Sequence, residues 1–187
     1  MIMKLRIADC GLRINCRCDC WIAGLLIGVT LSGAALHAEI IDRVLAVVAG
    51  QVITLSDVAA ARELGLQTGD GASDPVRAVL TKLIDRELEL AEAERYAPPE
   101  PSAEAVDRAV EVIRARFPSA GAFEDALARS GIDDQHLRET LRQDLRIRAY
   151  EDQRFAGAGD RRAAVYAEWM AGLRRRGDVS DLYLTGR

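Results

Sequence analysis

Cysteine, histidine and aromatic residues are scarce in this 187-residue chain, and their scarcity argues against several kinds of chemistry. All four cysteines lie within the first 20 residues, and the only histidine after residue 37 is His136. The chain beyond residue 20 therefore has no disulfide and depends on its hydrophobic core for stability. A single histidine without cysteine argues against nucleophile triads and histidine metal sites. No glycine-rich phosphate loop of the expected form is present either.

The first 38 residues have the order of a secretory signal peptide. Basic side chains come first, a largely apolar stretch over residues 21–31 follows, and small residues lead to Ala38; the basic residues are Lys4, Arg6, Arg13 and Arg17. This order predicts export from the cytoplasm and cleavage after Ala38, although Leu36 is larger than the residue usual there. An uncleaved membrane anchor is the alternative, because residues 21–38 approach the roughly 18 apolar residues that a short span needs. The long basic region leaves the start codon open, with Met3 or an internal codon as alternatives.

The cysteines Cys10, Cys16, Cys18 and Cys20 all precede the apolar stretch and are expected to leave with the signal. Their Cys-x-Cys-x-Cys spacing also suits a zinc ion poorly, because the usual pairs have two or more residues between them. Removing residues 1–38 takes 4 of the 25 basic and 2 of the 29 acidic side chains, which leaves 21 against 27 and a net charge of -6. This acidic balance argues against a nucleic-acid partner.

Residues 39–187 are long enough for one domain with a single core, and their pattern is mostly helical. Two β-rich runs around Gly50 predict a hairpin over residues 44–54. Three predicted helices follow capping residues: residues 58–66 after capping groups at 54–57, residues 75–96 after Asp74, and residues 103–117 after Ser102. A short fourth helix is predicted around Phe123 and Leu127 and is closed by Gly131. A longer fifth helix is opened by Ile132 and Asp133 and has Leu137, Leu141 and Leu145 on its apolar face, and a last helix covers residues 161–176.

The residues between and after these helices predict a loop, a helix end and a strand. Three prolines in residues 97–101 predict a stiff loop rather than a docking motif. Arg174, Arg175 and Arg176 suit the negative end of a helix dipole better than they indicate a membrane or RNA patch. Residues 179–184 predict a short closing strand, and the hairpin is the partner available to it.

The remaining candidates for catalysis have ordinary explanations. His136 lies early in a helix, where an exposed polar side chain is expected. The paired acids Glu87 with Glu89 and Asp133 with Asp134 are expected to point to different sides of their helices, among many surface acids. We therefore assign no catalytic, cofactor-binding or metal residue, expect no cofactor, and attribute the apolar helix faces to the core. The sequence singles out no residues for binding a partner.

Residues 39–57, which read Glu-Ile-Ile-Asp-Arg-Val-Leu-Ala-Val-Val-Ala-Gly-Gln-Val-Ile-Thr-Leu-Ser-Asp, resemble the opening of SurA-type periplasmic chaperones. Residues 76–91 resemble the long central helix of that family, and the likeness resumes over residues 123–154. Residues 169–176 and 179–184 look like its closing helix and strand. The resemblance implies a helical SurA N-terminal-like domain, with residues 39–155 as its main part and residues 161–187 as its closing part.

In that family one or two parvulin-type prolyl isomerase domains precede the closing helix. Here six residues lie between Arg154 and Arg161, whereas a domain of that kind needs on the order of a hundred. The resemblance therefore implies an ATP-independent chaperone that binds unfolded or transiting envelope and outer-membrane proteins, and not an enzyme. A prolyl isomerase with an unrecognised site and an assembly partner dedicated to one envelope protein are the alternatives.

Overall fold

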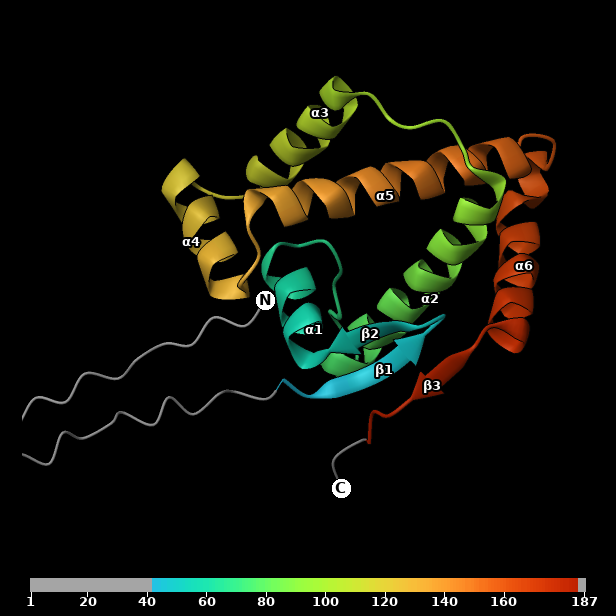
Figure 1. Ribbon diagram of the computed structural model, residues 1–187, viewed down its shortest axis with the longest axis horizontal. Coiled ribbons are helices and arrows are strands. Elements are labelled where there is room, and N and C mark those ends of the chain that lie inside the picture. The colour runs from blue at the N-terminus through green and yellow to red at the C-terminus, as the bar shows by residue number, and fades with distance from the viewer. Residues whose placement is uncertain (1–41, 185–187) are drawn as a thin grey trace, which may run out of the picture. The chain divides into compact units, whose positions relative to one another are not determined.

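The computed structural model describes residues 42–184, which are mostly helical with a small three-stranded antiparallel sheet (Figure 1). The predicted signal, its cleavage site and the cysteines lie outside these residues. The elements in order are β1 (Val44–Val48), β2 (Gln51–Thr54), α1 (Leu55–Glu63), α2 (Pro75–Tyr96), α3 (Ala103–Arg114), α4 (Ala120–Ser130), α5 (Asp134–Arg154), a short 3₁₀ turn (Gly159–Arg161), α6 (Arg162–Arg176) and β3 (Val179–Asp181). None of the helices in residues 42–184 has the length and apolar character needed to cross a membrane.

Most helices begin close to the predicted residue, although α1 begins at Leu55 and not at residue 58, and polar side chains cap the free backbone N–H groups of α1 to α5. Thr54 forms a capping box with Asp57, in which each side chain accepts from the backbone N–H of the other. Asp74 caps α2, with Pro75 at its first position, and Ser102 caps α3. These caps fix the direction in which each helix leaves the preceding loop.

The sheet has the order β2-β1-β3, which confirms that the closing strand pairs with the hairpin. Ala49 and Gly50 both have positive φ, at 49° and 84°, as a two-residue type I′ hairpin turn requires. The β1–β2 register shifts between Val44 and Ala46, so Leu45 and Ala46 are both fully buried instead of alternating. The bulge lets this short strand contribute more apolar area to the core.

The buried residues form two hydrophobic clusters, whereas the sequence predicts a single core. The first cluster joins the sheet to α2, the second half of α5 and α6, and it includes Leu80, Tyr150 and Trp169. The second joins the end of α1 to α3, α4 and the first half of α5, and it includes Phe123 and Leu137. The helix α5 passes from one cluster to the other, and it therefore holds the two halves of this fold together.

Several elements end earlier than the sequence predicts. The helix α1 ends at Glu63, with Gly65 at φ 64°, although the apolar pattern continues to residue 66. The helix α3 ends at Arg114, so Phe117 lies in the following turn, where its ring still packs edge-on to Phe123 at 5.5 Å between centroids. The strand β3 ends at Asp181 and not at residue 184.

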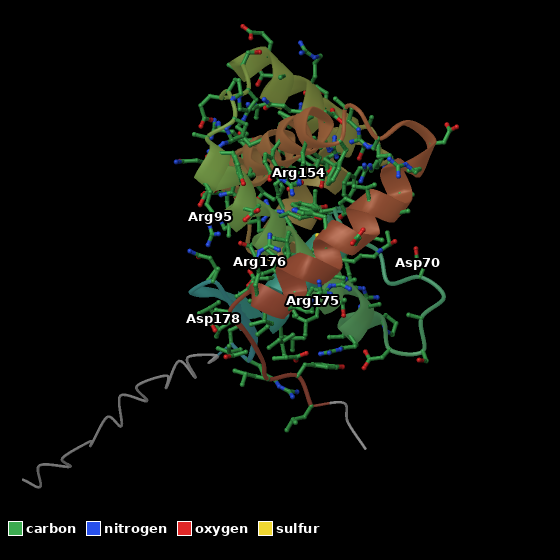
Figure 2. All side chains as sticks on the ribbon, turned by 90° about the vertical axis from the view of Figure 1, so that its right-hand side faces the viewer. Asp70, Arg95, Arg154, Arg175, Arg176 and Asp178 are labelled. Carbon is green, nitrogen blue, oxygen red and sulfur yellow. The ribbon has the colours of Figure 1, made fainter. Side chains whose placement is uncertain are left out.

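The basic end of α6 does more than face the helix dipole (Figure 2). Arg174 donates to Asp85 of α2, with Nε–Oδ1 at 2.7 Å, and Arg176 donates to Glu92 of α2 at 3.2 Å. Asp85 is largely buried and Glu92 almost fully, so these pairs are better shielded from solvent than ordinary surface pairs. They hold the closing helix against α2.

Candidate functional site: a cavity between the hairpin, α2 and α5

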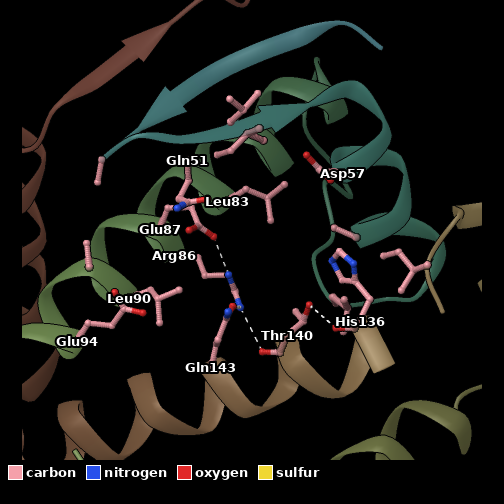
Figure 3. Close-up of a pocket in the computed structure, with 17 residues that line it drawn as sticks. Gln51, Asp57, Leu83, Arg86, Glu87, Leu90, Glu94, His136, Thr140 and Gln143 are labelled. Carbon is pink, nitrogen blue, oxygen red and sulfur yellow. Dashed lines mark hydrogen bonds and ion pairs between the residues drawn. The ribbon is translucent and has the colours of Figure 1, made fainter. Parts of the chain in front are cut away.

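A cavity of about 450 Å³ lies between β2, α1, α2 and α5 (Figure 3). Exposed residues form its mouth, among them Gln51, Val52, Asp57, Glu94 and His136. Its apolar lining consists of Ala49, Val52, Ile53, Ala61, Leu66, Leu83, Leu90, Ala91 and Ile132. Its polar lining consists of Gln51, Asp57, Arg86, Glu87, Glu94, His136, Thr140 and Gln143. The volume lies within the range of ordinary ligand pockets.

Arg86 crosses the floor of the cavity from α2 to α5. Its Nε donates to Asp144 Oδ1 at 2.7 Å, and its Nη2 donates to Gln143 Oε1 at 3.0 Å and to the Thr140 carbonyl at 3.2 Å. Its Nη1 donates to Glu87 Oε1 at 2.7 Å. Only 13% of the side chain is exposed, so these are shielded, charge-assisted bonds. They fix the spacing of α2 and α5 and therefore the width of the cavity.

The charge around the cavity is predominantly acidic. Asp57, Glu87 and Glu94 contribute three carboxylates, and among residues 42–184 Arg86 is the one Lys or Arg side chain in the lining. The guanidinium of Arg86 is already paired with Glu87 and with Asp144. A bound group therefore meets apolar walls and uncompensated negative charge, which favours a ligand with apolar and basic parts.

A second cavity, of about 340 Å³ and with a mostly polar lining, contains the least expected titratable group of the fold. Glu89 of α2 is 8% exposed and accepts a hydrogen bond from the Tyr166 hydroxyl of α6. Burial raises the pKa of Glu89 to about 7; the Tyr166 hydrogen bond opposes this rise, and the nearby Glu151 adds to it. Burial also raises the pKa of Glu151. Glu89 therefore takes up a proton as the pH falls through neutral.

We expect Glu89→Gln to stabilise the protein at pH 8 by about 2 kcal/mol and to have little effect near pH 5. The folded-state pKa of Glu89 is raised above its value in the unfolded chain, so its stabilising proton is lost as the pH rises through about 7. The side-chain carbonyl of the glutamine variant keeps the acceptor for Tyr166 without this dependence. Urea unfolding at both pH values measures the difference, with Glu168→Gln on the exposed side of α6 as the charge-matched control. Parallel pH profiles of wild type and Glu89→Gln would contradict the assignment.

The residues that were weighed as catalytic candidates from the sequence lie in different parts of the fold. His136 is exposed at the mouth of the cavity, and Asp133 caps α5 by accepting from the His136 N–H at 2.7 Å. Asp134 pairs with Arg138 one turn later. Glu87 and Glu89 point to different sides of α2, as predicted, but Glu89 is not a surface acid.

Sequence reasoning missed the cavity as a site, although α2 carries a signal for it. Residues 83, 86, 87, 90, 91 and 94 follow helical spacing and form a mixed apolar and charged face. Other apolar residues of the same helix, among them Val79, Leu80 and Leu88, lie on different sides of it and are buried in the first cluster. A helix that is buried on more than one side is central in its fold, and charges among its apolar positions mark a polar site.

Among residues 42–184, no three His, Asp or Glu side chains are grouped so that they could hold a metal ion. A comparison with protein-family models finds no match for this chain, and neither does a comparison with curated proteins. The cavity and the residues that carry the resemblance are therefore the features of this chain that bear on its function.

Proposed function

We propose that this chain is an ATP-independent, chaperone-like protein of the periplasm that binds unfolded or transiting envelope and outer-membrane proteins. The observation that carries the proposal is the cavity between β2, α2 and α5, which combines apolar walls with a charged, accessible mouth. Client segments in transit expose apolar side chains, and such a cavity shields them while its charges keep the free protein soluble.

The sequence adds support at both ends of the domain. The SurA-like opening, residues 39–57, contains the hairpin and the first turn of α1, which form one wall of the cavity. The SurA-like closing residues 169–176 and 179–184 cover the end of α6 and the third strand. Export, cleavage after Ala38 and the absence of isomerase activity belong to the same proposal.

The test is suppression of aggregation by the purified protein when an unfolded outer-membrane protein is diluted from urea. We expect light scattering to fall as the protein approaches equimolar amounts, with no requirement for ATP. Serum albumin at the same concentration controls for nonspecific crowding. Unchanged scattering, together with no binding of client peptides, would refute the proposal.

Two further measurements separate the alternatives. Acceleration of cis-to-trans conversion in a proline peptide would indicate a prolyl isomerase, and we expect the uncatalysed rate. Proteins captured from the envelope by cross-linking are expected to be many and unrelated, whereas a single recurrent partner would indicate a dedicated assembly factor.

A further inference from the structure

Among residues 42–184, no strand pairs with the outer edge of β2, because the sheet order is β2-β1-β3; we call this side of β2 its free edge. In Figure 1, β2 lies on the side of the sheet nearer to α5, and β3 lies on the far side. The β2 residues Gln51, Val52 and Ile53 line the cavity, whose opposite wall includes Thr140 and Gln143 of α5. The free edge of the sheet therefore borders the candidate site.

The hydrogen-bond pattern of β1 identifies which groups of β2 are free. Ala49 N–H donates to the Asp178 carbonyl, toward β3, at 2.9 Å. Directions alternate along an antiparallel strand, so Val47 also faces β3 while its neighbours face β2. Val52 lies opposite Val47, and its backbone N–H and C=O consequently point away from β1. The next outward N–H, that of Thr54, already donates to Asp57 at 2.8 Å.

Val52 thus provides one donor and one acceptor at an accessible position. Its side chain is 53% exposed, whereas Ile53 is 4% exposed and points into the core. Side chains of a strand added beside β2 would alternate in the same way, with every second one on the face that is covered by α2. On that face α2 contributes Leu83 and Leu90 and the carboxylates of Glu87 and Glu94.

We propose that an extended, basic polypeptide segment binds this cavity by adding as a strand to the free edge of β2 at Val52, with its Lys or Arg side chains beside Glu87 and Glu94. The proposal depends on the proposed chaperone-like function and specifies how a client is held. Main-chain hydrogen bonds are independent of sequence and suit many clients, whereas the acidic mouth selects for positive charge.

The probe is a fluorescein-labelled octapeptide of alternating Lys and Val, titrated into the full chain and followed by anisotropy. A matched peptide is N-methylated on its valines, because with lysine on the face covered by α2 the valine N–H groups face β2; this removes the donors of that edge and leaves every side chain in place. We expect the methylated peptide to bind about tenfold more weakly or worse, because main-chain bonds to Val52 are lost. Replacement of Lys by Glu is expected to weaken binding by a similar factor.

The matching protein variants are Val52→Pro and Val52→Thr. Proline removes the outward N–H of an edge strand without removing a ladder bond, and threonine keeps both the β-branch and the N–H. We expect Val52→Pro to lose about tenfold in affinity and Val52→Thr to lose much less, because threonine keeps the backbone N–H. Circular dichroism shows whether Val52→Pro is folded, and the methylated peptide tests the same bonds without any change to the protein.

Equal binding of the methylated and unmethylated peptides would overturn strand addition, and equal binding of the Lys and Glu peptides would overturn the charge selection. Either result combined with suppressed aggregation leaves the chaperone-like function intact. If neither peptide binds and aggregation is unchanged, both proposals are wrong.

Discussion

Trp169→Ala is expected to lower the free energy of unfolding by about 3 to 5 kcal/mol. Trp169 is 7% exposed, and its ring lies within 6.1 Å of Tyr150, 5.4 Å of Phe155 and 5.7 Å of Tyr166, centroid to centroid. These aromatic contacts join α6 to the end of α5. Because a domain of this size is stable by only about 5 to 15 kcal/mol, truncation of the indole removes a large part of the total.

Two matched variants make this expectation specific. Trp169→Phe keeps a ring, and it removes the indole Nε1, which is buried without a hydrogen-bond partner among residues 42–184. We therefore expect Trp169→Phe to lose much less unfolding free energy than Trp169→Ala, because a ring is kept and an unsatisfied buried donor is removed. Val112→Ala on α3, where the side chain is 59% exposed, is expected to change stability by no more than about 0.5 kcal/mol. Urea unfolding measures all three, and equal losses for Val112→Ala and Trp169→Ala would contradict the account of the core.

Arg86→Ala is expected to cost about 3 kcal/mol, because it leaves Asp144, Gln143 and the Thr140 carbonyl without their shared donor. Arg86→Lys keeps the charge but not the planar set of donors, so we expect it to restore only part of the loss. The matched control is Arg142→Ala on α5, whose side chain is 40% exposed and pairs within the helix with Glu139. Its expected cost is below about 0.5 kcal/mol.

A double-mutant cycle distinguishes a specific bond from a general loss of charge. Asp144→Ala alone is expected to destabilise the protein, and the combination with Arg86→Ala is expected to cost less than the sum of the two. Urea unfolding of the four proteins gives the coupling between α2 and α5. Additive losses would show that Arg86 does not set the spacing of these helices, and with it the width of the cavity.

The local structure was predictable because it depends on neighbours in the sequence. Thr54, Asp74, Ser102 and Asp133 each precede a helical pattern, and each caps its helix. The hairpin follows from β-rich runs on either side of Gly50. Such signals act over about four residues and need no knowledge of the fold.

The features that could not be predicted depend on contacts between residues that are far apart in the sequence. Leu145 was expected to share a stripe with Leu137 and Leu141, but it is only half-buried, because the second half of α5 turns Ile147 and Tyr150 into a different cluster. The partner of Arg86 on α5 lies 58 residues away in the chain. Helical spacing shows which residues share a face, and it does not show which helix that face meets.

Glu89 shows the same limit for a titratable group. It lies between Leu88 and Leu90 on a helix rich in surface acids, so the local pattern indicates exposure. Its burial depends on Tyr166, 77 residues later, which closes over it from α6. Only the packing of α6 on α2 creates this site, and its consequence is the pH dependence expected for the wild-type protein.

The most direct test of the central claim is to locate a bound client on the protein by nuclear magnetic resonance. The isotope-labelled protein is titrated with an unlabelled, extended segment of an outer-membrane protein that carries alternating apolar and basic residues. We expect saturable amide shift changes concentrated at Gln51, Val52 and Ile53 and along the cavity-facing sides of α2 and α5. Saturable changes confined to the outer face of α6 or to α3 and α4, or no changes at all, would contradict the central claim.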